Sequence, residues 1–348
     1  MFPTLSDLKS ARGLMPSRFA LVLILTAAIA TAVAPSRAGA SSEASTTHPQ
    51  YKYISLSAPF PGVTLTLGYG INNFGDVVGT YEINKAPTGY PPDLVQHGFV
   101  LKNGTYTTID VPFPGATNTV AAGINNLGDV VGTYVDSDEN SHGFTLKKGV
   151  FTSFDFPGPD VLDTTANAIN DTGSIVGYYY DLNSQQRRGF LFNGRRFASI
   201  DPPFSDACCT RARGINNRGE IVGDYLQGYT AFGFTRKQGK FQSLDWSFPP
   251  DFPDPFASEN ALPSGSNNRG DVVGLGFVYV YGNFTPFSDM DLGLSEVSAN
   301  GVNDWGEVVG NILQNDLPKA GFLLIPEYKV SIARGQMPTR AVYLRKPD

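Results

Sequence analysis

Cysteine and histidine are scarce in this chain of 348 residues, which contains two Cys and three His. Cys208 and Cys209 are neighbours, and no His or third Cys lies near them in the sequence, so a Cys/His metal site is not expected there. Because His48 lies close to the N-terminus, a nucleophile–His–acid triad would have to use His97 or His142. The sequence also lacks Walker, Gly-rich dinucleotide, HExxH and CxxC motifs. No catalytic constellation is evident.

A long apolar run occurs near the N-terminus. Lys9, Arg12 and Arg18 precede the sixteen residues 19–34, and the small residues 38–40 follow them. Sixteen residues are fewer than the roughly 20 that a spanning helix needs. We therefore predict a signal peptide at residues 1–40 and a linker at residues 41–50. An uncleaved membrane anchor is the alternative.

The chain is acidic. Its formal net charge is −6, and removal of residues 1–40 takes away four positive charges and one negative charge, which leaves about −9. An acidic exported protein is a poor candidate for nucleic-acid binding. We expect an extracytoplasmic protein, secreted or periplasmic, with no membrane span after signal removal.

Turn-forming and aromatic residues are abundant. The chain has 38 Gly, 25 Pro, 24 Phe and 16 Tyr, and 41% of its residues are hydrophobic. This composition is typical of a globular protein built from short strands and many turns. It predicts an all-β fold.

One phrase, Gly-Ile-Asn-Asn-x-Gly-Asp-Val-Val-Gly in its first copy, returns six times, at residues 70–79, 123–132, 168–177, 214–223, 265–274 and 301–310. A single unit cannot bury its own apolar face, so the copies must stack. Asn-Asn-x-Gly predicts a hairpin turn, because Asn caps local amides and Gly takes a positive φ. The Val-Val that follows predicts a buried strand.

Each copy continues with a Gly-Phe pair and a further turn, which predicts four short strands per unit. The turn glycines are 36 to 53 residues apart, a spacing typical of propeller blades. In the fifth copy a single residue separates Gly274 from Gly276, which predicts a truncated second strand or a very tight connection.

The sixth copy ends after its third strand, whereas residues 53–62, before the first copy, match residues 106–115 of a fourth strand. Pairing of these two segments would close the ring and protect the sheet edges. We therefore predict a six-bladed β-propeller of four-stranded antiparallel blades at residues 51–326, closed by an N-terminal strand that completes the last blade. A linear β-solenoid is the alternative. Residues 327–348 alternate like a β-hairpin appendage.

Loop length varies on one face only. In an up-and-down blade the first and third turns share a face, and here they are short and uniform. The second loops and the crossings between blades vary, as in residues 82–96 and the Pro-rich residues 248–256. A rigid ring that presents adaptable loops binds through them, so the variable face is the expected binding surface.

Four tyrosines recur at the end of the second strand and are candidate ligand-binding residues: Tyr81, Tyr134, Tyr179 and Tyr225. They would stack on sugars or peptides at the variable face. Packing between blades, with the hydroxyl groups hydrogen-bonded, is the alternative.

Two sets of acids also recur. The set that follows the turn glycines would form a carboxylate ring for calcium, interrupted by Ser174: Asp76, Asp129, Glu220, Asp271 and Glu307. Because calcium needs converging oxygens and these acids lie on different blades, solvated charges beside hairpins are the alternative. The second set closes the fourth strands, where capping of turn amides is expected rather than catalysis: Asp110, Asp155, Asp201 and Asp245. We predict no other cofactor.

The adjacent residues Cys208 and Cys209 admit a vicinal disulfide. Neighbouring Cα atoms lie about 3.8 Å apart, whereas disulfides prefer about 4.4 to 6.8 Å, so this bridge would be strained. Two free thiols in a loop are the alternative.

The linked motifs of residues 51–326 resemble the HAF-repeat family of bacterial extracellular proteins. The resemblance rests on the Asn-Asn-x-Gly phrase, on His-Gly-Phe at residues 97–99 and 142–144, and on the Ile-Asp-x-Pro strand. Gly98 and Gly143 stand where the alanine of the family name would be, and four copies lack the His. The resemblance implies export and a propeller-like array, and it brings no catalytic residues.

The sequence therefore predicts an exported binding or scaffolding module of the cell envelope or exterior, with a glycan or protein as its partner. The alternative is a hydrolase or lyase that acts on extracellular polysaccharide and uses acids from the crossings, such as Asp206, Asp251 or Asp254.

Overall fold

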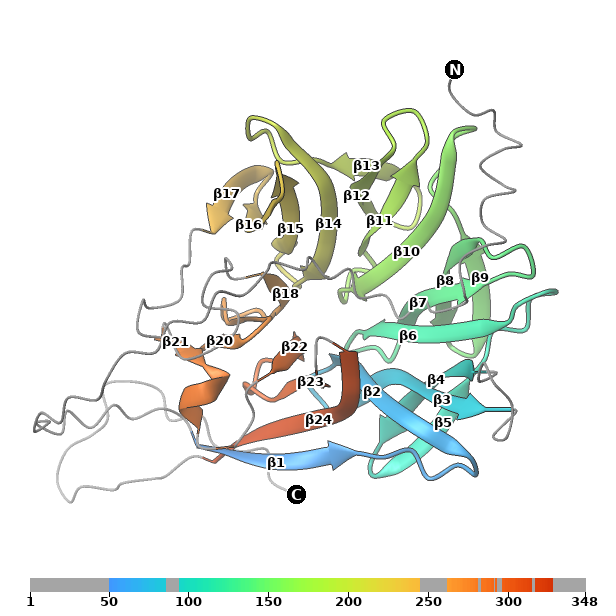
Figure 1. Ribbon diagram of the computed structural model, residues 1–348, viewed down its shortest axis with the longest axis vertical. Helices are drawn as coiled ribbons and strands as arrows, with labels where there is room; N and C mark the ends of the chain where they lie inside the picture. Colours follow the sequence, from blue (N-terminus) through green and yellow to red (C-terminus); the bar gives the residue numbers. More distant parts are fainter. Residues whose placement is uncertain are drawn as a thin grey trace, which may run out of the picture.

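The protein is a six-bladed β-propeller. A computed structural model describes residues 50–327 except 86–93, 245–261, 281–282, 291, 293–295 and 315–316. Its strands form six antiparallel sheets of four strands each, which stand around a common axis (Figure 1). The predicted fold class is confirmed, and the linear solenoid is wrong.

Blades 1 to 3 run in chain order from the axis outward. Their strands are β2 (Val63–Ile71), β3 (Val77–Asn84), β4 (Leu94–Lys102), β5 (Thr105–Ile109), β6 (Asn118–Ile124), β7 (Val130–Val135), β8 (Ser141–Lys147), β9 (Val150–Phe154), β10 (Val161–Ile169), β11 (Ile175–Asp181), β12 (Gln186–Phe192) and β13 (Phe197–Ile200).

Blades 4 to 6 follow the same order. Their strands are β14 (Ala207–Ile215), β15 (Ile221–Gln227), β16 (Thr230–Lys237), β17 (Lys240–Leu244), β18 (Pro263–Ser266), β19 (Val272–Gly274), β20 (Phe277–Val280), β21 (Asn283–Pro286), β22 (Val297–Val302), β23 (Val308–Gln314), β24 (Leu317–Glu327) and β1 (Gln50–Leu56). A short 3₁₀ helix, η2 (Phe287–Met290), follows β21.

The ring closes through its N-terminal strand. β1 pairs antiparallel with β24, from Gln50 opposite Glu327 to Leu56 opposite Gly321, so the blue and red ends of the ribbon share one sheet (Figure 1). Tyr51 and Leu56 of β1 are buried in this blade and its neighbour. The predicted closure is confirmed, and it pairs an edge that would otherwise be open.

The turns take the conformations that their residues favour. Gly75 has φ +77° in the first hairpin turn, and the turn glycines of the other blades are also at positive φ. The third turn of blade 1, Asn103-Gly104, has φ of +49° and +78°, as a type I′ hairpin requires. These turns fix the register of the strands on either side.

A glycine and a phenylalanine form the centre of each blade. Phe99 is fully buried, and its ring lies over Gly79 of the neighbouring strand, where an added Cβ would come within 2.8 Å of the ring and 1.9 Å of the Leu67 carbonyl oxygen. The same pairing recurs in every blade, with fully buried Phe144, Phe190, Phe234, Phe277 and Phe322. Burial of such a ring stabilises the fold by about 1.5–3 kcal/mol.

Blade 5 is the irregular one, as expected. β19 has three residues, and Gly276 turns the chain at φ +75° directly into β20. Both predicted features, the truncated strand and the tight connection, occur together.

Several sequence predictions lie outside the described residues. These are the signal peptide at residues 1–40, the linker up to residue 49, and the appendage from residue 328. None of the helical segments among the described residues has the length and apolarity that a membrane span requires.

Candidate functional site

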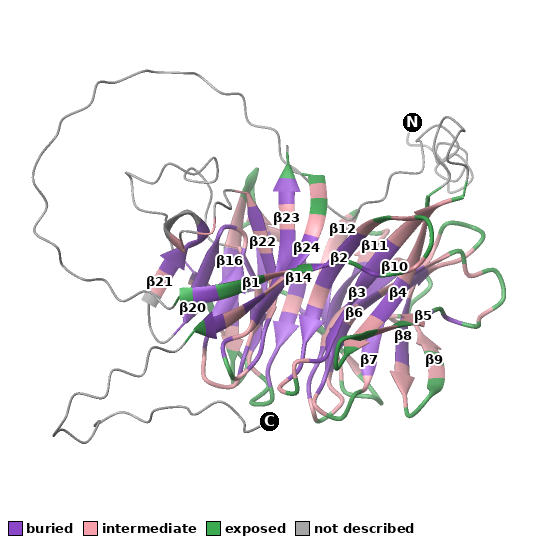
Figure 2. Cartoon of the chain, turned by 90° about the horizontal axis from the view of Figure 1, so that it is seen from below, coloured by how far each residue is buried: buried purple, intermediate pink, exposed green. Residues whose placement is uncertain are grey.

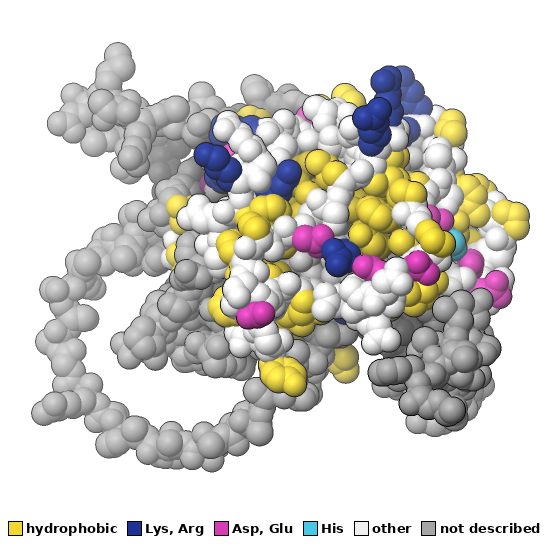
Figure 3. All heavy atoms as spheres, turned by 90° about the horizontal axis from the view of Figure 1, so that it is seen from above, with side chains coloured by type: hydrophobic (Ala, Val, Ile, Leu, Met, Phe, Trp, Pro, Cys, Tyr) yellow, Lys and Arg dark blue, Asp and Glu magenta, His cyan; other side chains and the backbone are white. Residues whose placement is uncertain are grey.

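The propeller has two unlike faces. The first and third turns of each blade leave by the uniform-turn face, and the second loops and inter-blade crossings leave by the variable-loop face. Figure 2 shows the strands running from one face to the other. The side of the outer wall that Figure 3 shows mixes apolar, basic and acidic side chains without a field of one sign.

Two cavities lie on the propeller axis, inside the innermost strands β2, β6, β10, β14, β18 and β22 (Figure 1). They have volumes of about 70 Å³ on the side of the uniform-turn face and about 80 Å³ on the other side. The two cavities share six mostly apolar lining residues, one from each innermost strand, which we call the constriction: Ile71, Ile124, Ile169, Ile215, Ser266 and Val302. The lining residues on either side of this ring differ.

The uniform-turn cavity is lined by a closed ring of asparagines. The Nδ2 of the first asparagine in each turn donates to the backbone carbonyl of its counterpart in the next blade, at 2.8–3.2 Å, in the order Asn72, Asn125, Asn170, Asn216, Asn267, Asn303 and back to Asn72. The Oδ1 of Asn72 accepts from the backbone N–H groups of Phe74 and Asp76, and each other copy does the same. One side chain thus shapes its turn and joins two blades.

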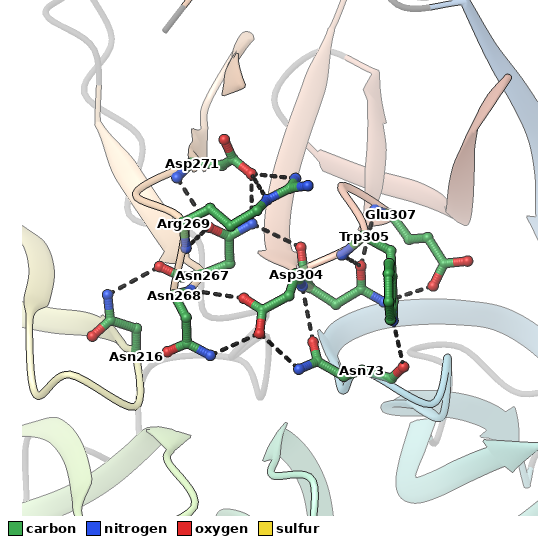
Figure 4. A network of polar contacts seen from close by, with 10 residues as sticks. Asn73, Asn216, Asn267, Asn268, Arg269, Asp271, Asp304, Trp305 and Glu307 are labelled. Carbon is green, nitrogen blue, oxygen red and sulfur yellow. Dashed lines mark hydrogen bonds and ion pairs between the residues drawn. The ribbon is translucent and has the colours of Figure 1, made fainter. Parts of the chain in front are cut away.

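A second ring lies beside the first. The backbone N–H of the second turn residue donates to the side-chain Oδ1 of its counterpart in the next blade, at 2.8 Å in every case, in the order Asn73, Asn126, Asp171, Asn217, Asn268, Asp304 and back to Asn73. Oδ2 of Asp304 also accepts from Nδ2 of Asn73 and of Asn268 (Figure 4). Asp171, on the opposite side of the ring, accepts from Asn126 and Asn217 in the same way. The asparagine and aspartate side chains of the two rings are therefore occupied in holding the blades together.

The predicted carboxylate ring lies on this face, but its members are held apart. Asp76, for example, accepts from Asn72 of its own turn and pairs with Lys102 at 3.3 Å. Asp129, Glu220 and Asp271 likewise pair with Lys147, Lys237 and Arg269. The described residues contain no group of three or more His, Cys, Asp or Glu that could hold a metal ion. Calcium binding stays a prediction.

The four recurring tyrosines lie between blades. They are buried, with exposed fractions of 2–7%, and each packs against a phenylalanine from the preceding crossing: Phe60, Phe113, Phe156 and Phe204. The hydroxyl of Tyr81 bonds to Thr108 at 2.8 Å, and Tyr134, Tyr179 and Tyr225 bond to serines of their fourth strands. These contacts agree with the alternative interpretation, in which the tyrosines pack between blades with their hydroxyl groups hydrogen-bonded. Ligand binding by these tyrosines stays a prediction, with little ring surface open to it.

The acids that close the fourth strands pair with side chains of the third strand. Asp110 accepts from Nδ1 of His97, and Asp155 from Nδ1 of His142, with each imidazole stacked on the tyrosine of its blade. Arg188 takes the histidine position opposite Asp201. The expected role in capping turn amides is therefore wrong for these three acids, because their carboxylates face a basic side chain across the sheet. Asp245 lies outside the described residues.

His142 has both ring nitrogens engaged, since its Nε2 contacts Asp136 at 3.1 Å. Burial lowers the pKa of His142, but the hydrogen bonds and charges of Asp136 and Asp155 outweigh burial and raise it. Burial raises the pKa of Asp136, but bonds from Asn140, His142 and Asp138 prevail and lower it to about 2. This cluster fixes the loop at Asp136 and leaves no ring nitrogen free for general-base catalysis.

The acids of the enzyme alternative do not form a site in the described structure. Asp206 is an exposed turn residue with φ +57° whose carboxylate contacts Ser205. Asp251 and Asp254 lie outside the described residues.

The two cysteines are free thiols at the start of β14, with their Sγ atoms 3.1 Å apart. Cys209 has φ +56°, and Asp163 occupies the same position in β10 with φ +54°. The left-handed residue is therefore a feature of the β-bulge in both strands and does not require a disulfide. Burial and the neighbouring Cys209 raise the pKa of Cys208 to about 11. The vicinal disulfide stays a prediction.

Three residues of each innermost strand line the larger cavity, and one of the three is the extra residue of the β-bulge nearest the Asn turn. These extra residues, the bulge ring, are Tyr69, Ala122, Asn167, Arg213, Ser264 and Asn300. Each strand runs from the variable-loop face to the Asn turn, so the bulge ring lies on the variable-loop side of the constriction. The neighbouring positions are nearly identical in all blades, whereas the bulge ring differs in size, polarity and charge.

Sequence reasoning missed an arginine pair at this ring. Arg211 donates from Nε and Nη2 to Asp224 at 2.8 and 2.6 Å, and Nε of Arg213 donates to the other oxygen of the same carboxylate. Burial raises the pKa of Asp224, but both arginines outweigh burial and lower it. An alignment of the repeats could have revealed this pair. The positions in blade 1 that are equivalent to Arg211 and Asp224 hold the uncharged Leu67 and Thr80.

No protein-family model matches this sequence, and no curated protein matches it. Solved structures with a similar fold include a mutant of AofleA from Arthrobotrys oligospora (12% identity, TM-score 0.42, 80% of this chain and 91% of that one). Others are Penicillium chrysogenum α-L-arabinanase with arabinobiose (12%, 0.40, 80% and 99%) and Aleuria aurantia lectin with α-methyl-L-fucoside (11%, 0.36, 75% and 77%). At such identities and scores, these likenesses carry no functional argument.

Proposed function

We propose that this chain is an exported binding or scaffolding module of the cell envelope or exterior, which takes the polar end of a glycan or protein ligand into the axial cavity on the variable-loop side. One observation carries the proposal: the bulge ring is the place on the axis where six otherwise matching copies differ. Positions that hold the ring together repeat, whereas positions that recognise a ligand need not.

Polarity at this ring supports binding. Asn167 donates from Nδ2 to the carbonyl of Ala212, and Asn300 donates to the carbonyl of Gly68, so both amides are fixed in orientation. Tyr69 is half-buried and keeps its proton, because burial and the charge of Glu82 raise its pKa. Oriented donors and acceptors around a concavity are the usual elements of a small polar site.

Binding is tested by applying the protein, purified from the medium or periplasm of an exporting host, to a glycan array with and without EDTA. The proposal expects binding to a restricted set of glycans, and loss of signal in EDTA would identify a cation in the site. If no glycan binds, the glycan version is wrong, and capture of a defined envelope protein becomes the remaining test of the module.

Export has its own measurement. The signal-peptide motif favours cleavage after Ala40, and the resemblance to the HAF-repeat family favours export. N-terminal sequencing of the exported protein should therefore begin at Ser41. A protein retained in the membrane with an intact N-terminus would contradict export by cleavage.

A further inference from the structure

The arginine pair of blade 4 places an uncompensated charge beside the axial cavity. Arg211 and Arg213 share the single carboxylate of Asp224. Among the described residues, no other carboxylate lies within ion-pair distance of either guanidinium. Two positive charges against one negative charge leave a net charge of +1 in this cluster.

The geometry turns part of this charge toward the cavity. The Asp224 side chain is 1% exposed, whereas that of Arg213 is 32% exposed and lines the cavity. Arg211 uses two nitrogens on Asp224, but Arg213 uses only Nε. The terminal nitrogens of Arg213 make no hydrogen bond to the described residues. They present a planar pair of donors, the geometry that binds a carboxylate through two bonds.

The fold does not require this charge. In blades 1 and 2 the equivalent strand pairs are Leu67 opposite Thr80 and Val120 opposite Thr133. Thr80 bonds to the Thr119 carbonyl and Thr133 accepts from the Ala166 N–H, so the neutral residue also joins its blade to the next. Burying ions is costly unless they are fully paired. Burial has the largest effect on the pKa of Arg213. Together with repulsion from Arg211, it outweighs the attraction of Asp224 and lowers that pKa.

We propose that the axial cavity binds the carboxylate of an acidic ligand, held by the terminal nitrogens of Arg213. This inference rests on the proposed binding function and names the ligand chemistry. At about 80 Å³, the cavity exceeds the space that a single water molecule needs but is small, which suits an anionic end-group rather than a chain. Asn167 and Tyr69, on the same ring, would contact the atoms next to the carboxylate. The source of the carboxylate is either a free small acid or a uronic-acid residue.

The test compares charged and neutral probes on the full exported protein, in an amine buffer free of carboxylate and phosphate. D-glucuronate, its uncharged methyl ester and acetate are titrated, with melting temperature and calorimetric Kd as readouts. Glucuronate should raise the melting temperature, because a ligand that binds only the folded state stabilises it, and the methyl ester should not. Stabilisation by acetate as well would assign the site to small acids in general. Equal effects of glucuronate and its ester, or no effect of either acid, would overturn the inference.

The Arg213→Gln variant should weaken glucuronate binding at least tenfold. Arg195→Gln is the matched control, because Arg195 is exposed in the β12–β13 turn away from the axis. If Arg213→Gln does not fold, the ester comparison on the unmodified protein still decides. Glycan-array binding that Arg213→Gln leaves unchanged would sustain the proposed function and refute this inference. An empty array with a clear glucuronate shift would refute the glycan version of the proposed function and sustain this inference.

Discussion

The two faces of this propeller are made by the same six repeats, yet they differ in kind. On the uniform-turn face, two closed rings of hydrogen bonds join each blade to the next. On the variable-loop side of the constriction, the bulge ring ranges from Ala122 to Arg213. The comparison teaches that repetition marks the residues that hold the ring, and that divergence marks the residues that are available for recognition.

The largest effect should follow from opening the ring. Deletion of residues 50–56 removes β1, exposes the edge of β24 and takes Tyr51 and Leu56 out of the core. The cooperative melting transition should be lost. The control is the chain that starts at Ser41, which keeps β1. A deletion variant that melts as the control does would show that closure is not needed and that the rings alone hold the blades.

A buried repeat phenylalanine should come next. Phe144→Ala empties the centre of blade 2, where the ring is fully buried, and should cost about 3–5 kcal/mol of unfolding free energy. Leu127→Ala, at a 71% exposed turn position of the same blade, should change it by less than about 0.5 kcal/mol. Denaturant unfolding followed by circular dichroism measures both. Equal losses would mean that the core is not where the structure places it.

The Asn ring should contribute less per residue than the core. Asn170→Ala leaves two turn N–H groups and the Asn216 carbonyl without their partner, and an unsatisfied buried group costs about 1–3 kcal/mol. Asn193→Ala removes a similar turn cap at an exposed position and should cost about 1 kcal/mol or less. If Asn170→Ala left the unfolding free energy unchanged, the hydrogen-bonded rings of the uniform-turn face would not contribute to the stability of the closed propeller.

The smallest effect should be electrostatic. Because the pKa of His142 is raised in the folded state, its pairing adds stability at pH values below its ordinary pKa and loses it as the pH rises through the raised value. His142→Phe introduces the residue that blade 4 has at this position, Phe232. Loss of the ion pairs should lower the unfolding free energy by up to about 1 kcal/mol near pH 5.5 and by much less near pH 8.5.

Chemical denaturation at the two pH values measures the difference. His97→Phe is the matched variant, because His97 contacts one carboxylate where His142 contacts two, and it should lose less stability near pH 5.5 than His142→Phe. A His142→Phe variant with the same deficit at both pH values would assign the histidine to packing on Tyr134 alone.

Much of the fold could be predicted from the sequence. Residue types reveal both the repeated turn and the extra fourth-strand segment that precedes the first copy. The local half of the Asn rings was also readable, since Asn72 caps its own turn. The bond from Asn72 to the Asn125 carbonyl could not be predicted, because a sequence does not say how the turns of neighbouring blades lie relative to each other. Asp110 and His97 were each noticed, yet their pairing depends on strand register. The Arg211–Asp224 pair was not predicted, because both residues depart from the shared repeat pattern and their contact depends on strand register.

The most direct measurement compares an asparagine of β10 with one in the turn that follows β10. Asn170 belongs to the Asn ring, and Asn167, three residues earlier, belongs to the bulge ring, where blade 2 has Ala122. The melting temperature and the glycan-array profile are recorded for both alanine variants. Asn170→Ala loses two turn N–H partners and a bond to the next blade, so it should clearly lower the melting temperature and keep the profile. Asn167→Ala loses one bond, to the Ala212 carbonyl, so it should lower the melting temperature less and change the profile. The reverse pattern, or an unchanged profile in both, would contradict the division of labour between the two faces.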